Sequence, residues 1–124
     1  MKVKYTRLID ARGREVAISS RLTLGRVYHV MGIIISASGE RTFLLISEER
    51  EGEFPIMTGH KAECFEVVSE SIPSNWRPWM RNNTIGITPL AWQADDFSDA
   101  FYDHAPETLP IFERERAIIL REDP

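Results

Sequence analysis

The sequence has one cysteine, no long apolar run and no recognisable secretion signal. Because Cys64 has no second cysteine to pair with, an internal disulfide is excluded and a reducing compartment is favoured. The longest apolar run, around Ile33–Ile35, is far shorter than the roughly 20 residues that a membrane helix needs. Residues 1–7 lack the apolar core of a signal peptide. These absences predict a cytoplasmic protein without a membrane partner.

Motifs of catalysis are missing as well. The sequence contains no Gly-rich phosphate loop, nucleophile elbow or zinc-protease helix motif. His60 and Cys64, four residues apart, are the most reactive-looking pair, and a helix would place them on one face. Zinc sites use at least three protein ligands, whereas His29 and His104 are isolated in the sequence. We therefore expect no enzymatic activity, no metal and no cofactor, with Cys64 a small buried apolar residue.

Length and composition suit one globular domain, and charge is unevenly distributed along it. The chain has 124 residues, of which 43% are hydrophobic and 27% charged. Residues 1–50 carry nine Lys/Arg and five Asp/Glu, a balance of +4. Residues 51–124 carry six Lys/Arg and fourteen Asp/Glu, a balance of −8. Such asymmetry bears on the choice of partner rather than on the fold.

Residues 22–76 predict a small, strongly bent antiparallel sheet. The run 27–35 is rich in β-branched and aromatic residues, and a second run over 42–46 follows a Ser/Gly-containing turn at 36–39. Two such runs joined by a short Gly-containing loop predict a hairpin. A third strand is expected over 54–57, and a fourth over Cys64 to Val68.

The N-terminal segment predicts a separate hairpin before this sheet. Polar and apolar residues alternate over 2–9 and again over 14–18, with a turn signal at 10–13. The whole chain is then one domain, with the hairpin in residues 1–21, the sheet in 22–76, and a loop and C-terminal helices in 77–124.

The segment after Trp76 predicts a loop over 77–83, a short strand over 84–87 and then helix. Thr88 suits an N-cap and Pro89 the first helical position. One face of that helix would carry Leu90, Ala94, Phe97 and Phe101. Alternatively, Asp95 and Asp96 cap a second short helix that begins near Phe97.

The last apolar segment leaves two alternatives open. Pro110 limits where a final helix can begin, and the apolar run 117–120 is compatible with helix or strand. The dense Glu/Arg pattern at 113–116 favours helix. We expect Trp76 and Trp92 to close the sheet against the helices, with partners for their indole N–H groups. The predicted fold class is α+β, mainly β.

Three short motifs carry a resemblance to known proteins. They are Leu22-x-x-Gly25-x-x-Tyr28-x-Val30, Phe65-Glu66-Val67-Val68 and Ile72-Pro73-x-x-Trp76. Together they resemble small SH3-like bacterial proteins, whose C-terminal parts would correspond to Trp92, residues 96–102 and residues 111–115 here. Proteins of this appearance include immunity proteins of contact-dependent growth inhibition and other polymorphic toxin systems. The resemblance spans residues 20–120 and implies an SH3-like sheet or barrel that neutralises a toxin domain.

The C-terminal third contains an acidic and aromatic segment. No Lys or Arg occurs between Arg81 and Arg114. The carboxylates in this gap are Asp95, Asp96, Asp99, Asp103 and Glu107, and the interleaved aromatic residues are Trp92, Phe97, Phe101 and Tyr102. If Phe97 and Phe101 point inward, the acids and Tyr102 face outward and suit a basic protein partner. An ordinary solvated acidic helix would show the same charge pattern.

This acidic segment suits a basic toxin domain as partner. A nuclease is the favoured class, because a nuclease binds phosphates and is therefore often basic. The candidate partner-binding residues are Asp95, Asp96, Asp99, Tyr102 and Asp103, with Trp79 as an exposed anchor in the preceding loop.

Nucleic-acid binding is the second hypothesis. The basic residues of the N-terminal half are Lys2, Lys4, Arg7, Arg12, Arg14, Arg21 and Arg26. They lie near Tyr5 and Tyr28 in the sequence, and basic residues beside aromatic ones suit backbone contact with base stacking. The net charge of −4 and the lack of a concentrated basic stripe weigh against it, so we rank a protein partner first.

Overall fold

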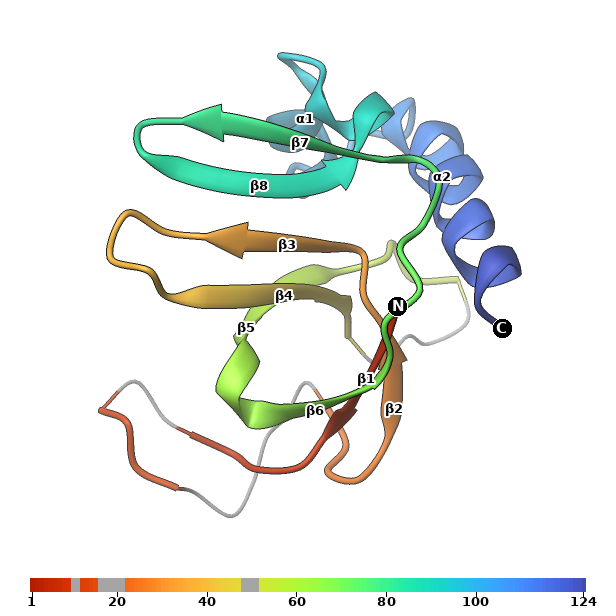
Figure 1. The fold of residues 1–124 in the computed structure, drawn as a ribbon. Helices are drawn as coiled ribbons and strands as arrows, with labels where there is room; N and C mark the ends of the chain where they lie inside the picture. Colours follow the sequence, from red (N-terminus) through yellow and green to blue (C-terminus); the bar gives the residue numbers. More distant parts are fainter. Residues whose placement is uncertain (10–11, 16–21, 48–51) are drawn as a thin grey trace.

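The computed structural model describes residues 1–9, 12–15, 22–47 and 52–124, and within them the chain is mainly β (Figure 1). The strands are β1 (Lys2–Tyr5), β2 (Val27–His29), β3 (Gly32–Ile35), β4 (Arg41–Ile46), β5 (Met57–Lys61), β6 (Phe65–Ser69), β7 (Trp76–Arg81) and β8 (Thr84–Pro89). The helical elements are the 3₁₀ turns η1 (Ala62–Cys64) and η2 (Leu90–Gln93) and the α-helices α1 (Phe97–Tyr102) and α2 (Thr108–Glu122). The predicted α+β, mainly-β fold class is confirmed.

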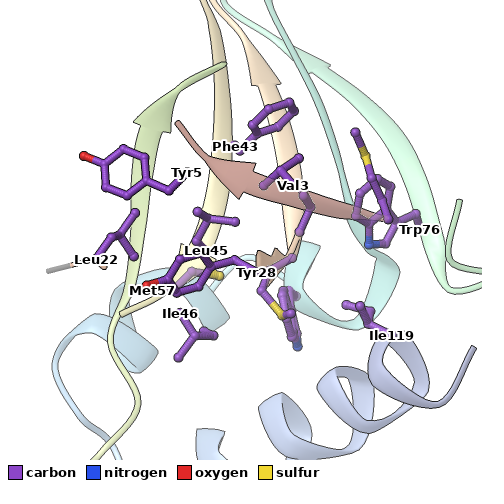
Figure 2. Close-up of a cluster of buried hydrophobic side chains, with 14 of the residues drawn as sticks. Val3, Tyr5, Leu22, Tyr28, Phe43, Leu45, Ile46, Met57, Trp76 and Ile119 are labelled. Atoms are coloured by element: carbon purple, nitrogen blue, oxygen red, sulfur yellow. The ribbon is translucent and has the colours of Figure 1, made fainter. Parts of the chain in front are cut away.

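Two antiparallel sheets curve around a shared interior (Figure 1). Their strand orders in the described residues are β2-β1-β6 and β5-β4-β3-β8-β7. Val3 of β1 and Leu45 of β4 are completely buried between the sheets. The Phe65 ring of β6 stacks on Tyr5 at 5.0 Å and meets the edge of Phe43 at 5.8 Å. This apolar interior, with Ile119 of α2 at its end, is the main core (Figure 2).

The β3–β4 hairpin forms as predicted. The amide of Ser36 donates to the carbonyl of Glu40 at 2.9 Å, and Gly39 takes a φ of +86°. The apolar run before it is interrupted, because Val30 and Met31 carry the chain from one sheet to the other. Val27–His29 and Gly32–Ile35 therefore belong to different sheets.

The predicted N-terminal hairpin is wrong for its first strand. β1 lies between β2 and β6, with Val3 opposite both Tyr28 and Val67. The described part of the expected partner segment contributes one isolated bridge, between Ile9 and Glu15. Residues 16–18, and residues 10 and 11 of the predicted turn, lie outside the described residues. β1 takes distant partners because they bury Val3 and Tyr5 inside the core.

The third strand lies three residues later than predicted. β5 starts at Met57, and Pro55 precedes it without a backbone donor for a sheet. β6 covers Phe65–Ser69, close to the predicted fourth strand. His60 lies in β5 and Cys64 in η1, so the pair does not share a helical face.

The segment 77–83 is not a loop: it contains most of β7 and the turn that joins β7 to β8 in a hairpin. β7 pairs along its whole length with β8, from Trp76 opposite Pro89 to Arg81 opposite Thr84. The turn between them has Asn82 and Asn83 at positive φ, as a two-residue hairpin turn of type I′ requires. β7 is an edge strand, which tolerates the proline at position 78. The sequence signal was obscured by that proline and by the charged residues.

The helices begin later than the first prediction placed them. Thr88 and Pro89 end β8 instead of starting a helix, because they pair with β7. The alternative prediction is confirmed for the start of the helix, since α1 begins at Phe97. The predicted capping is not observed, because Asp96 occupies the N-cap position without a side-chain capping hydrogen bond. α2 contains Pro110 in its first turn, where a missing N–H costs no helical hydrogen bond, and residues 117–120 are helical.

Trp76 and Trp92 are buried, as predicted, with 4% and 6% of their surface exposed. The expected partners of their indole N–H groups are absent, because neither nitrogen has a hydrogen-bond partner within the described chain. An unsatisfied buried donor costs about 1–3 kcal/mol, which burial of the large ring offsets. None of the helices in the described residues is both long and apolar enough to cross a membrane.

The two carboxylates at the end of α2 link stability to pH. Asp123 accepts a hydrogen bond from Ser69 Oγ at 2.6 Å and lies 2.9 Å from the Met1 amino group, and these contacts lower the pKa of Asp123. Glu122 accepts from the hydroxyl and the amide of Ser74, which lowers the pKa of Glu122. A carboxylate whose pKa is lower in the folded than in the unfolded state stabilises the fold at pH values above its unfolded-state pKa. This stabilisation is lost as the pH falls through the folded-state pKa.

We therefore expect unfolding free energy to fall as the pH drops below about 4, near the unfolded-state pKa of Asp and Glu. The double variant Asp123→Asn with Glu122→Gln should flatten this dependence in urea titrations between pH 6 and pH 2.5. The control Asp95→Asn with Glu66→Gln changes two exposed carboxylates that have no ion pair in the described chain. An equal flattening in the control would contradict the prediction.

Candidate functional site

The outer face of the five-stranded sheet forms the floor of the candidate site. Strand alternation places Trp79 (β7), Gly86 (β8), Ile34 (β3) and Thr42 (β4) in one row across this face. Leu44 lies in the neighbouring row. These side chains point away from the core between the sheets, because Phe43 and Leu45 occupy the alternate positions of β4.

Glycine makes room for the Trp79 ring on this face. A Cβ atom at Gly86 would lie 2.1 Å from the indole, so the ring passes directly over the glycine. The Trp79 Nε1–H donates to Thr88 Oγ1 at 3.2 Å, which fixes the orientation of the ring. Trp79 is thus a half-buried strand residue, not the exposed loop residue that we predicted. Recognising β7 as a strand would have revealed this position.

The wall of the site is built by η2 and α1. Gln93 Nε2 donates to the carbonyl oxygens of Arg77 at 2.9 Å and Thr88 at 3.0 Å, which ties η2 to the β7–β8 hairpin. Behind this wall, a cluster of aromatic rings continues the hydrophobic core: Trp92 stacks on Phe112 at 4.9 Å. Its other close pairs are Phe101–Phe112 at 4.6 Å and Phe97–Phe101 at 5.6 Å. Phe97 and Phe101 of the predicted helix face point inward, whereas Leu90 is 62% exposed, because η2 and α1 are separate elements and do not form one continuous helix.

Between floor and wall lies a pocket of about 410 Å³, here called the groove. Its floor includes Ile34, Leu44 and Trp79, and its wall includes Asp95 and Tyr102. The volume falls within the range of about 300–1,000 Å³ that is typical of ligand sites. The groove therefore combines an apolar floor with aromatic and acidic groups.

Three of the six predicted binding residues meet in the groove. Trp79, Asp95 and Tyr102 line it. Tyr102 keeps 51% of its surface exposed, and the buried part of the side chain raises the pKa of the phenol. The phenol therefore stays neutral and able to donate a hydrogen bond at neutral pH.

The other three predicted residues, Asp96, Asp99 and Asp103, are exposed around α1 outside the groove. Sequence reasoning missed the strand residues of the groove, including Met80, which is 72% exposed, and Arg81. The glycines at 32 and 86 were the signal, because a glycine within a strand often marks a close approach.

The acidic segment is rich in unpaired charge. All of its carboxylate residues, Asp95, Asp96, Asp99, Asp103 and Glu107, are exposed. In the part of the chain that the structure describes, none of them forms an ion pair. Asp96 occupies the N-cap position of α1, but its side chain makes no capping hydrogen bond. The negative charge of this surface is therefore available to a partner.

The basic N-terminal residues have a different setting. The rings of Tyr5 and Tyr28 are buried, with 5% and 8% of their surfaces exposed, which removes them as stacking platforms. Lys2 donates to the carbonyl of Pro124 at 2.7 Å, and Arg7 lies 3.2 Å from Glu15. Arg26 lies over the Tyr28 ring, and Arg21 is outside the described residues.

His60 and Cys64 lie on different elements, the strand β5 and the 3₁₀ turn η1. His60 Nε2 lies 2.7 Å from Thr58 Oγ1 on the same strand. Cys64 is buried, and burial raises the pKa of its thiol, which disfavours the thiolate. Within the described ranges, no group of three or more His, Cys, Asp or Glu residues could hold a metal ion.

Comparisons of this chain with protein-family models, curated proteins and solved structures found no match.

Proposed function

We propose that this chain is a cytoplasmic immunity protein that binds a cognate basic toxin domain, with a nuclease the favoured class, and occludes its active site. The observation that carries the proposal is the exposed acidic surface formed by the connection between η2 and α1 and by α1 itself. Its carboxylates lack ion pairs in the described chain, and one of them, Asp95, lines the aromatic groove. The proposal needs no catalytic group in this chain, because occlusion alone blocks the substrate.

Electrostatics supports a protein partner of opposite charge. Asp95, Asp96 and Asp99 are exposed and close together in the sequence, so their fields add. Arg81 borders the same groove as Asp95 and offsets one of these charges. A basic partner would be steered toward this surface and would lose no existing ion pair of the acids on docking. Tyr102 and Trp79 supply the aromatic area that commonly anchors a protein interface.

The neutralising role comes from the sequence resemblance to SH3-like immunity proteins and from the chemistry of nucleases. A nuclease must present cationic groups to phosphates, so its substrate channel is complementary to an acidic protein. The nucleic-acid hypothesis is weaker because its two aromatic residues, Tyr5 and Tyr28, are buried.

The test is reconstitution with the toxin domain encoded beside this chain. We expect a stoichiometric complex that abolishes nuclease activity, with an association rate that falls as salt rises from 50 to 500 mM. The wild-type chain alone should not bind RNA or DNA. Failure to inhibit the toxin, or nucleic-acid binding with a steep salt dependence, would contradict the proposal.

A further inference from the structure

We propose that the groove receives one arginine side chain of the protein partner, an inference that rests on the proposed function and specifies its anchor. The groove has two chemically distinct parts. Its floor is apolar, and its wall carries the Asp95 carboxylate beside the Tyr102 phenol. An arginine side chain has the same division, with an apolar stem and a planar cationic head.

The floor suits the stem and one face of the guanidinium. Ile34 and Leu44 are only partly buried, so they present apolar surface to the groove. One face of the Trp79 indole covers Gly86, which leaves its opposite face for an occupant. The hydrogen bond to Thr88 holds the ring flat on the sheet before any partner arrives. Guanidinium groups stack well on such preorganised indole faces.

The wall of the groove suits the positive charge of the guanidinium group. The Asp95 carboxylate is exposed and has no ion pair in the described residues, so it can accept the two parallel hydrogen bonds of a guanidinium. Arg81 also borders the groove, and its positive charge opposes the entry of a cation. Asp96 and Asp99 lie on the same segment as Asp95. Together the three carboxylates carry more negative charge than the single positive charge of Arg81. Arginine is favoured over lysine because the slot between sheet and wall offers both a ring face and a carboxylate.

The test is an NMR titration of the ¹⁵N-labelled full chain with the peptide acetyl-Gly-Arg-Gly-amide. The readout is the Trp79 indole N–H resonance, assigned by its disappearance in Trp79→Phe. Matched peptides carry citrulline, which keeps the shape without the charge, or leucine, which keeps only apolar surface. We expect saturable shifts with the arginine peptide and at least fivefold weaker binding of the other two.

Two variants locate the charge effect. Asp95→Asn should weaken binding of the arginine peptide by about two- to fivefold, the range for one exposed ion pair. Asp103→Asn, an exposed carboxylate outside the groove, should leave it unchanged. Three results would each contradict the proposal that the groove binds arginine. They are equal binding of the citrulline peptide, tighter binding of the leucine peptide, and no saturable shift up to 20 mM arginine peptide. Because no toxin is present in this experiment, its failure would leave toxin inhibition intact and would be distinguishable from failure of the proposed function.

Discussion

Replacing Trp92 by alanine is expected to lower the free energy of unfolding by about 3–5 kcal/mol. The Trp92 ring is 6% exposed and lies parallel to Phe97 and Phe112, at 6.2 and 4.9 Å between ring centroids. Truncation leaves a cavity at the junction of η2, α1 and α2, and the surrounding rings can fill it only in part. Its unsatisfied indole N–H is removed as well, which places the expected loss nearer the lower end of the range.

Urea denaturation followed by far-UV circular dichroism measures this loss. The matched control is Leu90→Ala in the same 3₁₀ turn, where the side chain is 62% exposed and the expected change is within about 0.5 kcal/mol. A loss below about 1 kcal/mol for Trp92→Ala would mean that the aromatic cluster around Trp92 contributes little to stability.

Reversing two carboxylates of the acidic surface is expected to weaken the toxin complex by orders of magnitude. Close charge pairs at interfaces couple by about 1.5–7 kcal/mol, and Asp95→Lys with Asp99→Lys replaces two potential attractions by repulsions. Both side chains are exposed and lack ion pairs in the described chain, so the variant should remain folded. Three measurements test this: the dissociation constant of the complex, the salt dependence of its association rate, and the protection of cells from the toxin.

A control pair separates a local interface from a general charge effect. Glu66→Lys with Glu70→Lys makes the same change in net charge on exposed residues at and beyond β6, in the other sheet. We expect near wild-type protection from this control. Unchanged affinity of the Asp95/Asp99 variant, or an equal loss in the control, would show that the proposed interface is wrong. The nucleic-acid hypothesis instead predicts that Arg12, Arg14 and Arg26 matter and that the acids do not.

The local features of the candidate site could be predicted from the sequence. The spacing of Phe97 and Phe101 indicated which side of α1 turns inward, and the exposed position of Tyr102 follows from it. The spacing of apolar residues acts within one or two turns, so neighbours in the sequence suffice to read it. The partner-binding role of these residues stays a prediction.

The groove itself could not be predicted, because it joins segments whose proximity depends on sheet pairing. Trp79 was expected in a loop, since Pro78 and the flanking arginines hide the strand pattern of β7. Its place above Gly86 depends on the register of β7 against β8, and the floor depends on β3 pairing with β8. The register and the pairing of these strands are decided by the burial of the whole sheet rather than by the local β-propensity of each segment.

The sequence by itself determined the mainly-β class, the β3–β4 hairpin, the burial of Trp76 and Trp92, and the concentration of acid in the C-terminal half. Only the tertiary structure decided that β1 lies between β2 and β6, with Val3 opposite Val67, and that the acidic segment borders an aromatic groove. The physical reason is that turn chemistry and hydrophobic spacing act over a few residues. Strand partners far apart in the sequence are selected by the apolar surface that their pairing removes from water.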